Sequence, residues 1–174
     1  MISVVKHDGS KEPLDLSKAS ASLEWAIGDL PGVSLSEIEV QSKLHFFDGI
    51  HTSYITDIHI KTCDDLADLR HPNYDSVARN LKLQKLYKQV FNSINPIGLL
   101  DFLTARVQAG HYSANVLNQP NVDYFALAQA IDHSRDFTFT SSGLDALVNG
   151  YGVCKYETPQ FIFMAIAIDA FRDY

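Results

Sequence analysis

The feature that most restricts the fold of this chain is the apolar run FIFMAIAI, which covers residues 161–168. Thr158 and Pro159 precede it, and proline is favoured in the first turn of a helix, so we predict a helix here. Every side of that helix is apolar, so it needs neighbours all round. A run of eight residues is too short to cross a membrane. We therefore expect another chain, or a continuation of this one, to bury it.

The composition indicates a folded protein without a nucleic-acid surface. The 174 residues are 46% hydrophobic and 20% charged, and the formal net charge is -7. Because sequence-independent binding of nucleic acid needs clustered basic residues, we expect no nucleic acid as a partner. No segment has the length of a membrane-spanning helix, and residues 1–10 are too polar for a signal peptide. We expect a soluble, cytoplasmic protein with no membrane partner.

The first half of the chain has the pattern of a β-hairpin followed by four helices. Residues 2–5 and 12–14 predict the two strands, and Asp8-Gly9 is a strong turn signal between them. Asp15 is the expected N-cap of the first helix, and Ser34 with Glu37 forms a capping box for the second. We predict helices over residues 16–27, over 35–47, from a cap at Thr52 or Ser53 to Leu69, and over 74–91.

The second half is predicted to be helical throughout. Residues 92–96 are polar and include Pro96, so we place a domain boundary there. Further helices are expected over 97–108, 122–131 and 142–148. The predicted fold class is mainly α, of the α+β type, with a first domain over 1–91 and a second over 92–174.

The common catalytic motifs are absent from the sequence. It contains no P-loop, no GxGxxG, no HExxH and no GxSxG. The two cysteines, Cys63 and Cys154, lie far apart without neighbours at metal-binding spacing, so we expect no zinc site and no disulfide framework. Both are expected to be inert, buried or half-buried thiols.

One set of residues offers both cations for phosphates and acceptors for a sugar or base. The candidate nucleotide-binding residues are Lys6, His7, Glu12, Asp15, Lys18, Thr52 and Lys88. The same residues also fit a solvated hairpin and helix face, and the residues alone favour that simpler interpretation.

Longer segments carry a resemblance to a known family. The opening VVKHDGSKEPLDLSKASASLEWA, the segment FFDGIHTSYITDIHIKTCDDL and the helix HPNYDSVARNLKLQKLYKQVF resemble the ATP-cone pattern. The later segments LLDFLTARVQAGHY, IDHSRDFTFTSSGLDALVNGYGV and YETPQFIFMAIAI are similar to the helical lead-in of class I ribonucleotide reductase large (alpha) subunits. The chain thus resembles an N-terminal fragment of such a subunit, with a hairpin and four-helix cone at 1–91.

The resemblance implies an allosteric site for ATP or dATP, with Mg²⁺ accompanying the nucleotide and no metal bound by the chain's own side chains. By position in the family pattern, Lys6 and His7 would hold phosphates, and Glu12 and Asp15 would approach the base or ribose. Lys18, Thr52 and Lys88 would complete the pocket. His7 stands where many cones have arginine.

The resemblance also implies that the chemistry lies elsewhere. The radical and redox cysteines of the family lie in a barrel beyond the matched region, so this chain alone is expected to be inactive. Its expected partners are that remainder of the large subunit and the radical-generating small subunit. Nucleotide binding would shift the assembly states of the subunits.

Two alternatives remain open. The chain could be a docking fragment whose cone has lost its ligand, which the departures from the family pattern at His7, Thr56 and Gln84 favour. It could also be a stand-alone nucleotide sensor, such as a repressor built on an ATP-cone. Those repressors add a zinc ribbon with four cysteines, whereas this chain has two. A nucleotide-binding measurement separates the docking fragment from a working cone, because the docking fragment is expected to bind no nucleotide.

Overall fold

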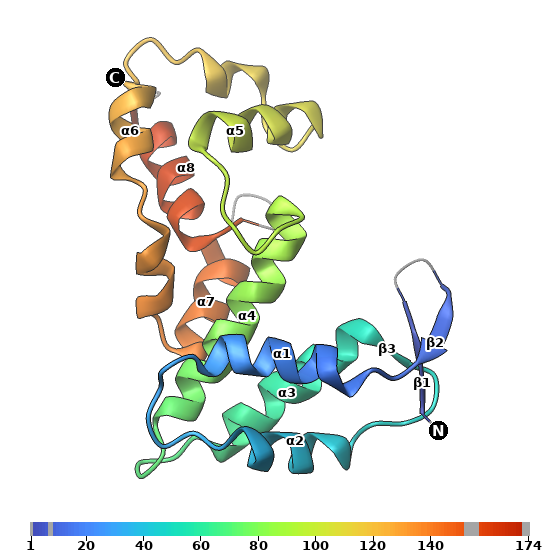
Figure 1. Cartoon of the computed structure of the whole chain (residues 1–174). Coiled ribbons are helices and arrows are strands. Elements are labelled where there is room, and N and C mark those ends of the chain that lie inside the picture. Colours follow the sequence, from blue (N-terminus) through green and yellow to red (C-terminus); the bar gives the residue numbers. More distant parts are fainter. Residues whose placement is uncertain (1, 7–8, 152–156, 172–174) are drawn as a thin grey trace. The chain divides into compact units, whose positions relative to one another are not determined.

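The computed structural model describes residues 2–6, 9–151 and 157–171. It is mainly helical with a small sheet near the N-terminus, which confirms the predicted fold class (Figure 1). The chain forms two compact units, Met1–Lys85 and Leu86–Tyr174. Helix α4, Asn73–Phe91, contributes residues to both units.

The sheet of the first unit has three short strands in the order β2-β1-β3. Strands β1, Ser3–Val5, and β2, Lys11–Pro13, form the predicted antiparallel hairpin. Strand β3, Ile50–His51, was not predicted, because two residues are too few to show an alternating pattern. It pairs in parallel with β1, so that Val5 lies opposite His51.

Asp48 fixes the turn that leads into β3. One of its carboxylate oxygens accepts hydrogen bonds from the backbone N–H and the hydroxyl of Ser3, at 2.8 and 2.7 Å. These two hydrogen bonds hold the pKa of Asp48 below its ordinary value. Gly49 follows with a φ of 80°, which glycine adopts without strain. The turn therefore places β3 beside Val4 and Val5 of β1.

Four helices pack in the first unit: α1, Leu16–Ile27; α2, Leu35–Lys43; α3, Thr52–Leu66; and the first part of α4. Asp15 accepts a hydrogen bond from the backbone N–H of Ser17 at 3.0 Å, which confirms the predicted cap of α1. Ser34 caps α2 as predicted, accepting from the N–H of Glu37 at 3.2 Å. The Glu37 carboxylate accepts from the Tyr74 hydroxyl at 2.8 Å, which leaves the predicted capping box half formed.

Helix α2 ends earlier than predicted. The sequence predicted helix as far as Phe47, but the last helical residue is Lys43. The N–H groups of Leu44 and His45 donate to carbonyls only three residues back, at 3.3 and 3.0 Å. Such bonds tighten and close a last helical turn. Phe47 therefore lies in the loop before β3 and is exposed.

Helix α3 differs from its prediction at both ends. Thr52 is its first helical residue rather than its cap, because His51 occupies the cap position without a side-chain hydrogen bond. Leu69 was predicted on the buried face, but it lies beyond the helix and is fully exposed. The Asp68 carboxylate accepts from the N–H groups of the two residues after Leu69, both at 2.7 Å, and so forms a turn instead.

The core of the first unit lies between these helices. Its fully buried apolar residues come from α1, α2, α3 and α4: Leu23, Ala26, Ile38, Ile60, Cys63, Tyr74, Val77, Ala78 and Leu81. Two ion pairs join α3 to α4 at the edge of this core. Lys82 lies 3.4 Å from Asp64, and Lys85 lies 2.5 Å from Asp57.

Among the described residues, the second unit contains the end of α4 and six further helices: α5, Leu99–Gln108; η1, Ala114–Leu117; α6, Tyr124–Ala130; η2, His133–Thr138; α7, Ser141–Tyr151; and α8, Pro159–Phe171. The predicted helices over 97–108, 122–131 and 142–148 are confirmed with shifted ends. The short η1 and η2 were not predicted. Asp123 sets the start of α6, because it accepts from the N–H groups of Phe125 and Ala126 at 3.1 and 3.0 Å.

Helix α8 supplies much of the second core. Phe161 stacks on Phe102 of α5 with ring centroids 3.9 Å apart and planes at 8°. On other sides of the same helix, Phe163 and Ile166 are 48% and 47% exposed. The described part of the chain therefore covers α8 only in part. No helix among the described residues is long and apolar enough to cross a membrane.

Candidate functional site

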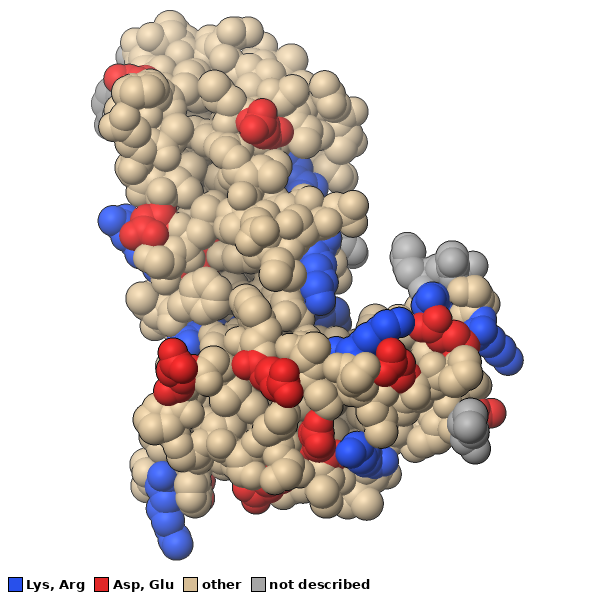
Figure 2. Space-filling view, in the orientation of Figure 1, with Lys and Arg blue, Asp and Glu red and all other residues tan. Residues whose placement is uncertain are grey.

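Four of the seven predicted site residues form one charged cluster at the hairpin and the start of α1. Glu12 is its centre, with Lys6 at 2.5 Å and Lys18 at 3.8 Å. Lys18 also lies 4.0 Å from Asp15. Figure 2 shows basic and acidic side chains next to one another over this part of the surface. These pairs are solvent-exposed, so each is weak and can exchange partners at low cost.

A fifth predicted residue, Thr52, lies at the same end of the β1–β3 pair as Lys6. Strands β1 and β3 are parallel, and Val5 lies opposite His51. Lys6 and Thr52 therefore leave the sheet at the same end, each one residue beyond this pair. Thr52 begins α3, and no side chain at the cap position bonds the first N–H groups of that helix. A helix N-terminus attracts anions through these groups.

Asp15 has a structural role in addition to its predicted one. Its carboxylate accepts hydrogen bonds from the hydroxyl and the backbone N–H of Ser17, at 2.5 and 3.0 Å. Those bonds, with the nearby charge of Lys18, lower its pKa below the ordinary value. A contact of Asp15 with a base or ribose stays a prediction.

The remaining two predicted residues are not part of this cluster as described. His7 lies outside the residues that the structure describes. Lys88 belongs to the second unit, where it is exposed near the end of α4. The sequence pattern did not predict β3, which joins Thr52 to the hairpin. The segment around Ile50 stood out only through its resemblance to the ATP-cone pattern.

Gln84, one departure from the family pattern, is buried in the first unit. Its side-chain oxygen accepts a hydrogen bond from the hydroxyl of Ser22 on α1 at 2.5 Å. On the same face of α4, Asn80 donates to the backbone carbonyl of Ala26 at 2.7 Å. These polar contacts fix α1 on α4 by directional hydrogen bonds.

Neither redox nor metal chemistry is supported by the described residues. Cys63 is buried in the first core, and burial raises the pKa of its thiol to about 12. Cys154 lies outside the described residues. Within the described ranges, no group of three His, Cys, Asp or Glu side chains is placed to hold a metal ion.

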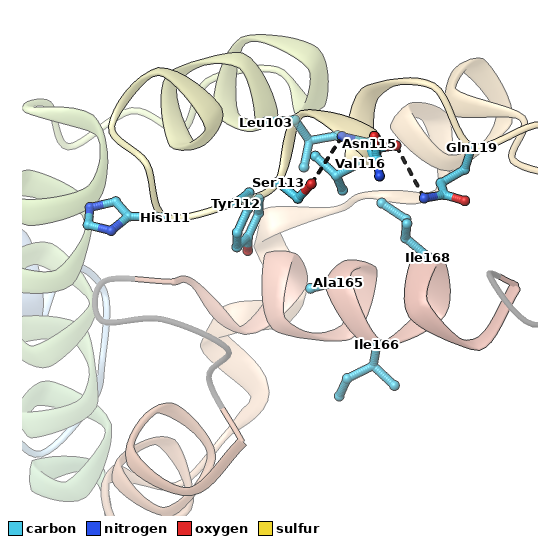
Figure 3. A pocket seen from close by; sticks show the side chains of 10 residues that line it. All are labelled: Leu103, His111, Tyr112, Ser113, Asn115, Val116, Gln119, Ala165, Ile166 and Ile168. Atoms are coloured by element: carbon cyan, nitrogen blue, oxygen red, sulfur yellow. Dashed lines mark hydrogen bonds between the residues drawn. The ribbon is translucent and has the colours of Figure 1, made fainter.

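A cavity of about 430 Å³ lies in the second unit between the 111–119 segment and α8. Ala165 and Ile168 of α8 face Ser113, Asn115 and Val116, while Ile166 points away (Figure 3). Two polar side chains of this wall bond to its own backbone: Gln119 donates to the carbonyl of Asn115 at 3.2 Å, and Ser113 accepts from the N–H of Asn115 at 3.4 Å. The lining therefore indicates no particular ligand chemistry.

The comparisons with known proteins identify the first unit. Residues 2–89 match the family described as the ATP cone domain. The ribonucleoside-diphosphate reductase 1 subunit alpha of Escherichia coli (strain K12) is 33% identical over 178 residues, which cover 98% of this chain and 23% of that protein. The ribonucleoside-diphosphate reductase subunit alpha of Helicobacter pylori is 34% identical over 173 residues, which cover 97% of this chain and 22% of that protein.

A third relative is the ribonucleoside-diphosphate reductase subunit alpha of Buchnera aphidicola subsp. Baizongia pistaciae. It is 29% identical over 181 residues, which cover 100% of this chain and 24% of that protein. The chain spans about a quarter of the length of these curated relatives, and it is their N-terminal region that it resembles. The resemblance read from the sequence is thereby confirmed. Because the family match runs from the first strand through almost all of α4, the chain belongs to the ATP cone domain family.

Proposed function

We propose that the cone, residues 1–91, binds ATP or dATP as an allosteric effector, and that residues 92–174 form a helical part of a reductase large subunit. The family match over residues 2–89 is the observation that carries the proposal. The charged cluster at the hairpin supports it, because ion pairs join four of the predicted residues, and the fifth, Thr52, follows the end of β3 beside which β1 also ends.

In this proposal the phosphates bind between the hairpin and the start of α3. Lys6 and Lys18 supply positive charge, and the uncapped N-terminus of α3 at Thr52 supplies N–H donors. Glu12, which forms ion pairs with both lysines, is released to accept from the ribose or the base. Asp15 assists it. The phosphate oxygens thus replace a carboxylate that was held only by weak surface pairs.

His7 and Lys88 complete the proposed site as further phosphate contacts. Mg²⁺ would arrive with the nucleotide and be held by its phosphate oxygens, because the described residues offer no cluster of carboxylates and imidazoles for it. A histidine at position 7 would add a full positive charge only when protonated, which makes its contact dependent on pH.

The larger assembly is proposed from the relatives, whose names describe ribonucleoside-diphosphate reductases. The chain would regulate the reduction of ribonucleotides to deoxyribonucleotides in the cytoplasm, with the remainder of the large subunit and a radical-generating small subunit as partners. Cys63 is buried with a raised pKa and offers no reactive thiol, which supports a chain that is inactive alone. Nucleotide would act by shifting the populations of assembly states.

The second candidate is a docking fragment that binds no nucleotide. The observation that favours it is that Glu12 forms ion pairs with both Lys6 and Lys18. A stand-alone sensor has no comparable support, because the relatives quoted above are reductase subunits.

Equilibrium titration of two lysine variants with ATP and with dATP separates the candidates. Lys6→Ala removes a charge-assisted phosphate contact of roughly 1.5–3 kcal/mol, so affinity should fall by about tenfold or more. Lys11→Ala is the matched control, since Lys11 is an exposed lysine on the neighbouring strand of the same hairpin. Its affinity should stay within about twofold of the unmodified chain. Equal affinities for both variants would remove the site, and absence of binding to the unmodified chain would favour the docking fragment.

A further inference from the structure

A buried carboxylate in the second unit joins three separate elements. Asp136 of η2 is 0% exposed. One of its oxygens accepts from the hydroxyl of Tyr87 on α4 at 2.6 Å and lies 3.0 Å from Nδ1 of His133. The other oxygen accepts from the backbone N–H of Gln160, the second residue of α8, at 3.2 Å. Asp136 thus bonds to the end of α4 and to the start of α8 at once.

Aromatic rings enclose this carboxylate and its histidine. The ring of His133 lies 6.0 Å from Tyr87, 6.1 Å from Phe91 and 5.1 Å from Phe161, measured between centroids. The second ring nitrogen of His133 is buried without a hydrogen-bond partner among the described residues. Burial and the charge of Asp136 raise the pKa of Tyr87, so its hydroxyl remains a donor. Asp136 itself is fully buried, so water has no ready access to its carboxylate.

The last turn of α4 is held from another side as well. The guanidinium of Arg106 on α5 is buried, lies 5.1 Å from the ring centroid of Phe102, and donates to the backbone carbonyl of Val90 at 3.1 Å. A cation that bonds a terminal carbonyl also offsets the negative end of the helix dipole. The end of α4 is therefore fixed within the second unit by both a cation and an anion.

Helix α4 is continuous from Asn73 to Phe91, while the boundary between the compact units falls after Lys85. Its earlier part supplies Val77 and Leu81 to the core of the first unit. An α-helix is stiff along its axis, because each residue is fixed to the next turn by hydrogen bonds. A displacement of α4 in the first unit is therefore passed to Tyr87.

We propose that Asp136 is a positioning residue that couples α4 to α8, so that the start of α8 follows the position of α4. If α4 moved and α8 stayed, Tyr87 would leave a fully buried carboxylate without one of its donors, which is costly where water cannot enter. The coupling stands on the geometry of the second unit alone. Its trigger rests on the proposed function, since nucleotide in the cone is what would displace α4.

Hydrogen exchange of the full chain tests the coupling without nucleotide. Tyr87→Phe keeps the ring and removes only the hydroxyl that bonds to Asp136. We expect the amides of the first two turns of α8, residues 160–166, to exchange at least fivefold faster in this variant. The Tyr87 hydroxyl bonds to η2 and not to α8, so faster exchange in α8 would have to be transmitted through Asp136. Tyr124→Phe removes another tyrosine hydroxyl of the same unit, which bonds to the carbonyl of Val116, and should change α8 exchange by less than twofold.

Equal α8 exchange in Tyr87→Phe and the unmodified chain, with unchanged far-ultraviolet circular dichroism, overturns the proposal. Asp136→Asn provides a second variant that keeps the side-chain shape and removes the charge, and it should accelerate exchange at the same amides at least as strongly. Unchanged exchange in that variant would also contradict the coupling.

A parallel measurement with saturating ATP tests the trigger. Bound ATP should change α8 exchange in the unmodified chain, and Tyr87→Phe should lose more than half of that change while its ATP affinity stays within about threefold. Binding of ATP without any change at α8 would overturn the proposed trigger. Absence of ATP binding would overturn the proposed function instead, and the nucleotide-free comparison would still decide the coupling.

Discussion

Val5 of β1 lies opposite His51 of β3 in a parallel pair. Because both strands run in the same direction, Lys6 and the first turn of α3 follow this pair at one end of the sheet. The pairing thereby joins a hairpin that offers charged side chains to a helix N-terminus that offers backbone N–H groups. The hairpin alone would lack the backbone N–H donors, and the start of α3 alone would lack the lysines.

The double role of Glu12 gives a sharp prediction. Glu12→Gln removes the negative charge that pairs with Lys6 and Lys18. Inorganic tripolyphosphate, which has no ribose or base, should bind this variant about two- to fivefold more tightly, in line with an exposed ion pair of roughly 0.2–1 kcal/mol. ATP should gain less or lose affinity, because Glu12 also accepts from its ribose or base. Calorimetric titration of both ligands measures the difference, and an equal gain for both would contradict a nucleoside contact of Glu12.

His59 should make the stability of the first unit depend on pH. It is 3% exposed, its ring centroid lies 5.9 Å from that of Phe46, and burial lowers its pKa to about 4 against the opposing charge of Glu39. Above pH 6.5 His59 is neutral in both states. Below it the unfolded chain binds a proton that the folded chain does not, so the free energy of unfolding should fall between pH 6.5 and about 4, by up to roughly 3 kcal/mol.

Urea unfolding at several pH values checks this prediction. In His59→Gln the free energy of unfolding should fall much less as the pH is lowered. His45 is an exposed histidine just beyond α2, and His45→Gln should show the same fall as the unmodified chain. A decrease of the same size in the His59 variant would show that other groups cause the acid sensitivity.

Cys63 should be unreactive in the folded chain. Its side chain is buried in the first core, and its pKa of about 12 leaves almost no thiolate at pH 8. In a Cys154→Ser background, labelling by iodoacetamide at pH 8 should be at least about a hundredfold slower than in the urea-unfolded chain. Rapid labelling under native conditions would mean that the core formed by α1, α3 and α4 opens readily.

Phe161 should be a main contributor to the stability of the second unit. It is 1% exposed and stacks on Phe102 at 3.9 Å, so Phe161→Ala should cost about 3–5 kcal/mol. Phe163→Ala is the control on the same helix, and because that ring is 48% exposed it should cost about 1 kcal/mol or less. Chemical unfolding measures both. Similar costs would imply that the exposed side of α8 is covered in solution, for example by self-association.

Elements with local signals could be predicted from the sequence. Asp15 and Ser34 mark helix starts because their side chains bond to the next few backbone N–H groups, and this needs no distant partner. The hairpin follows from a turn signal between two short runs. The charged residues of the hairpin could be predicted for the same reason, since Glu12 lies on β2 and Lys6 directly follows β1 in the same hairpin.

Elements fixed by distant contacts, or by local hydrogen bonds that leave no mark on the apolar pattern, could not be predicted. Strand β3 exists because Asp48 bonds to Ser3 far back in the sequence, and its two residues show no pattern of their own. The early end of α2 and the turn at Asp68 depend on local hydrogen bonds that the apolar periodicity does not reveal. The buried Asp136 gave no signal, because its partners come from two other helices.

We propose that ATP binds where β1 and β3 end together. A titration of the ¹⁵N-labelled chain with ATP, followed by nuclear magnetic resonance, tests both binding and place. We predict saturable shifts of the amide signals of Lys6, Thr52 and Ser53, with smaller changes at Lys11 on the neighbouring strand. No saturable shift at these positions in millimolar ATP, or shifts confined to residues outside the hairpin and the start of α3, would contradict the account.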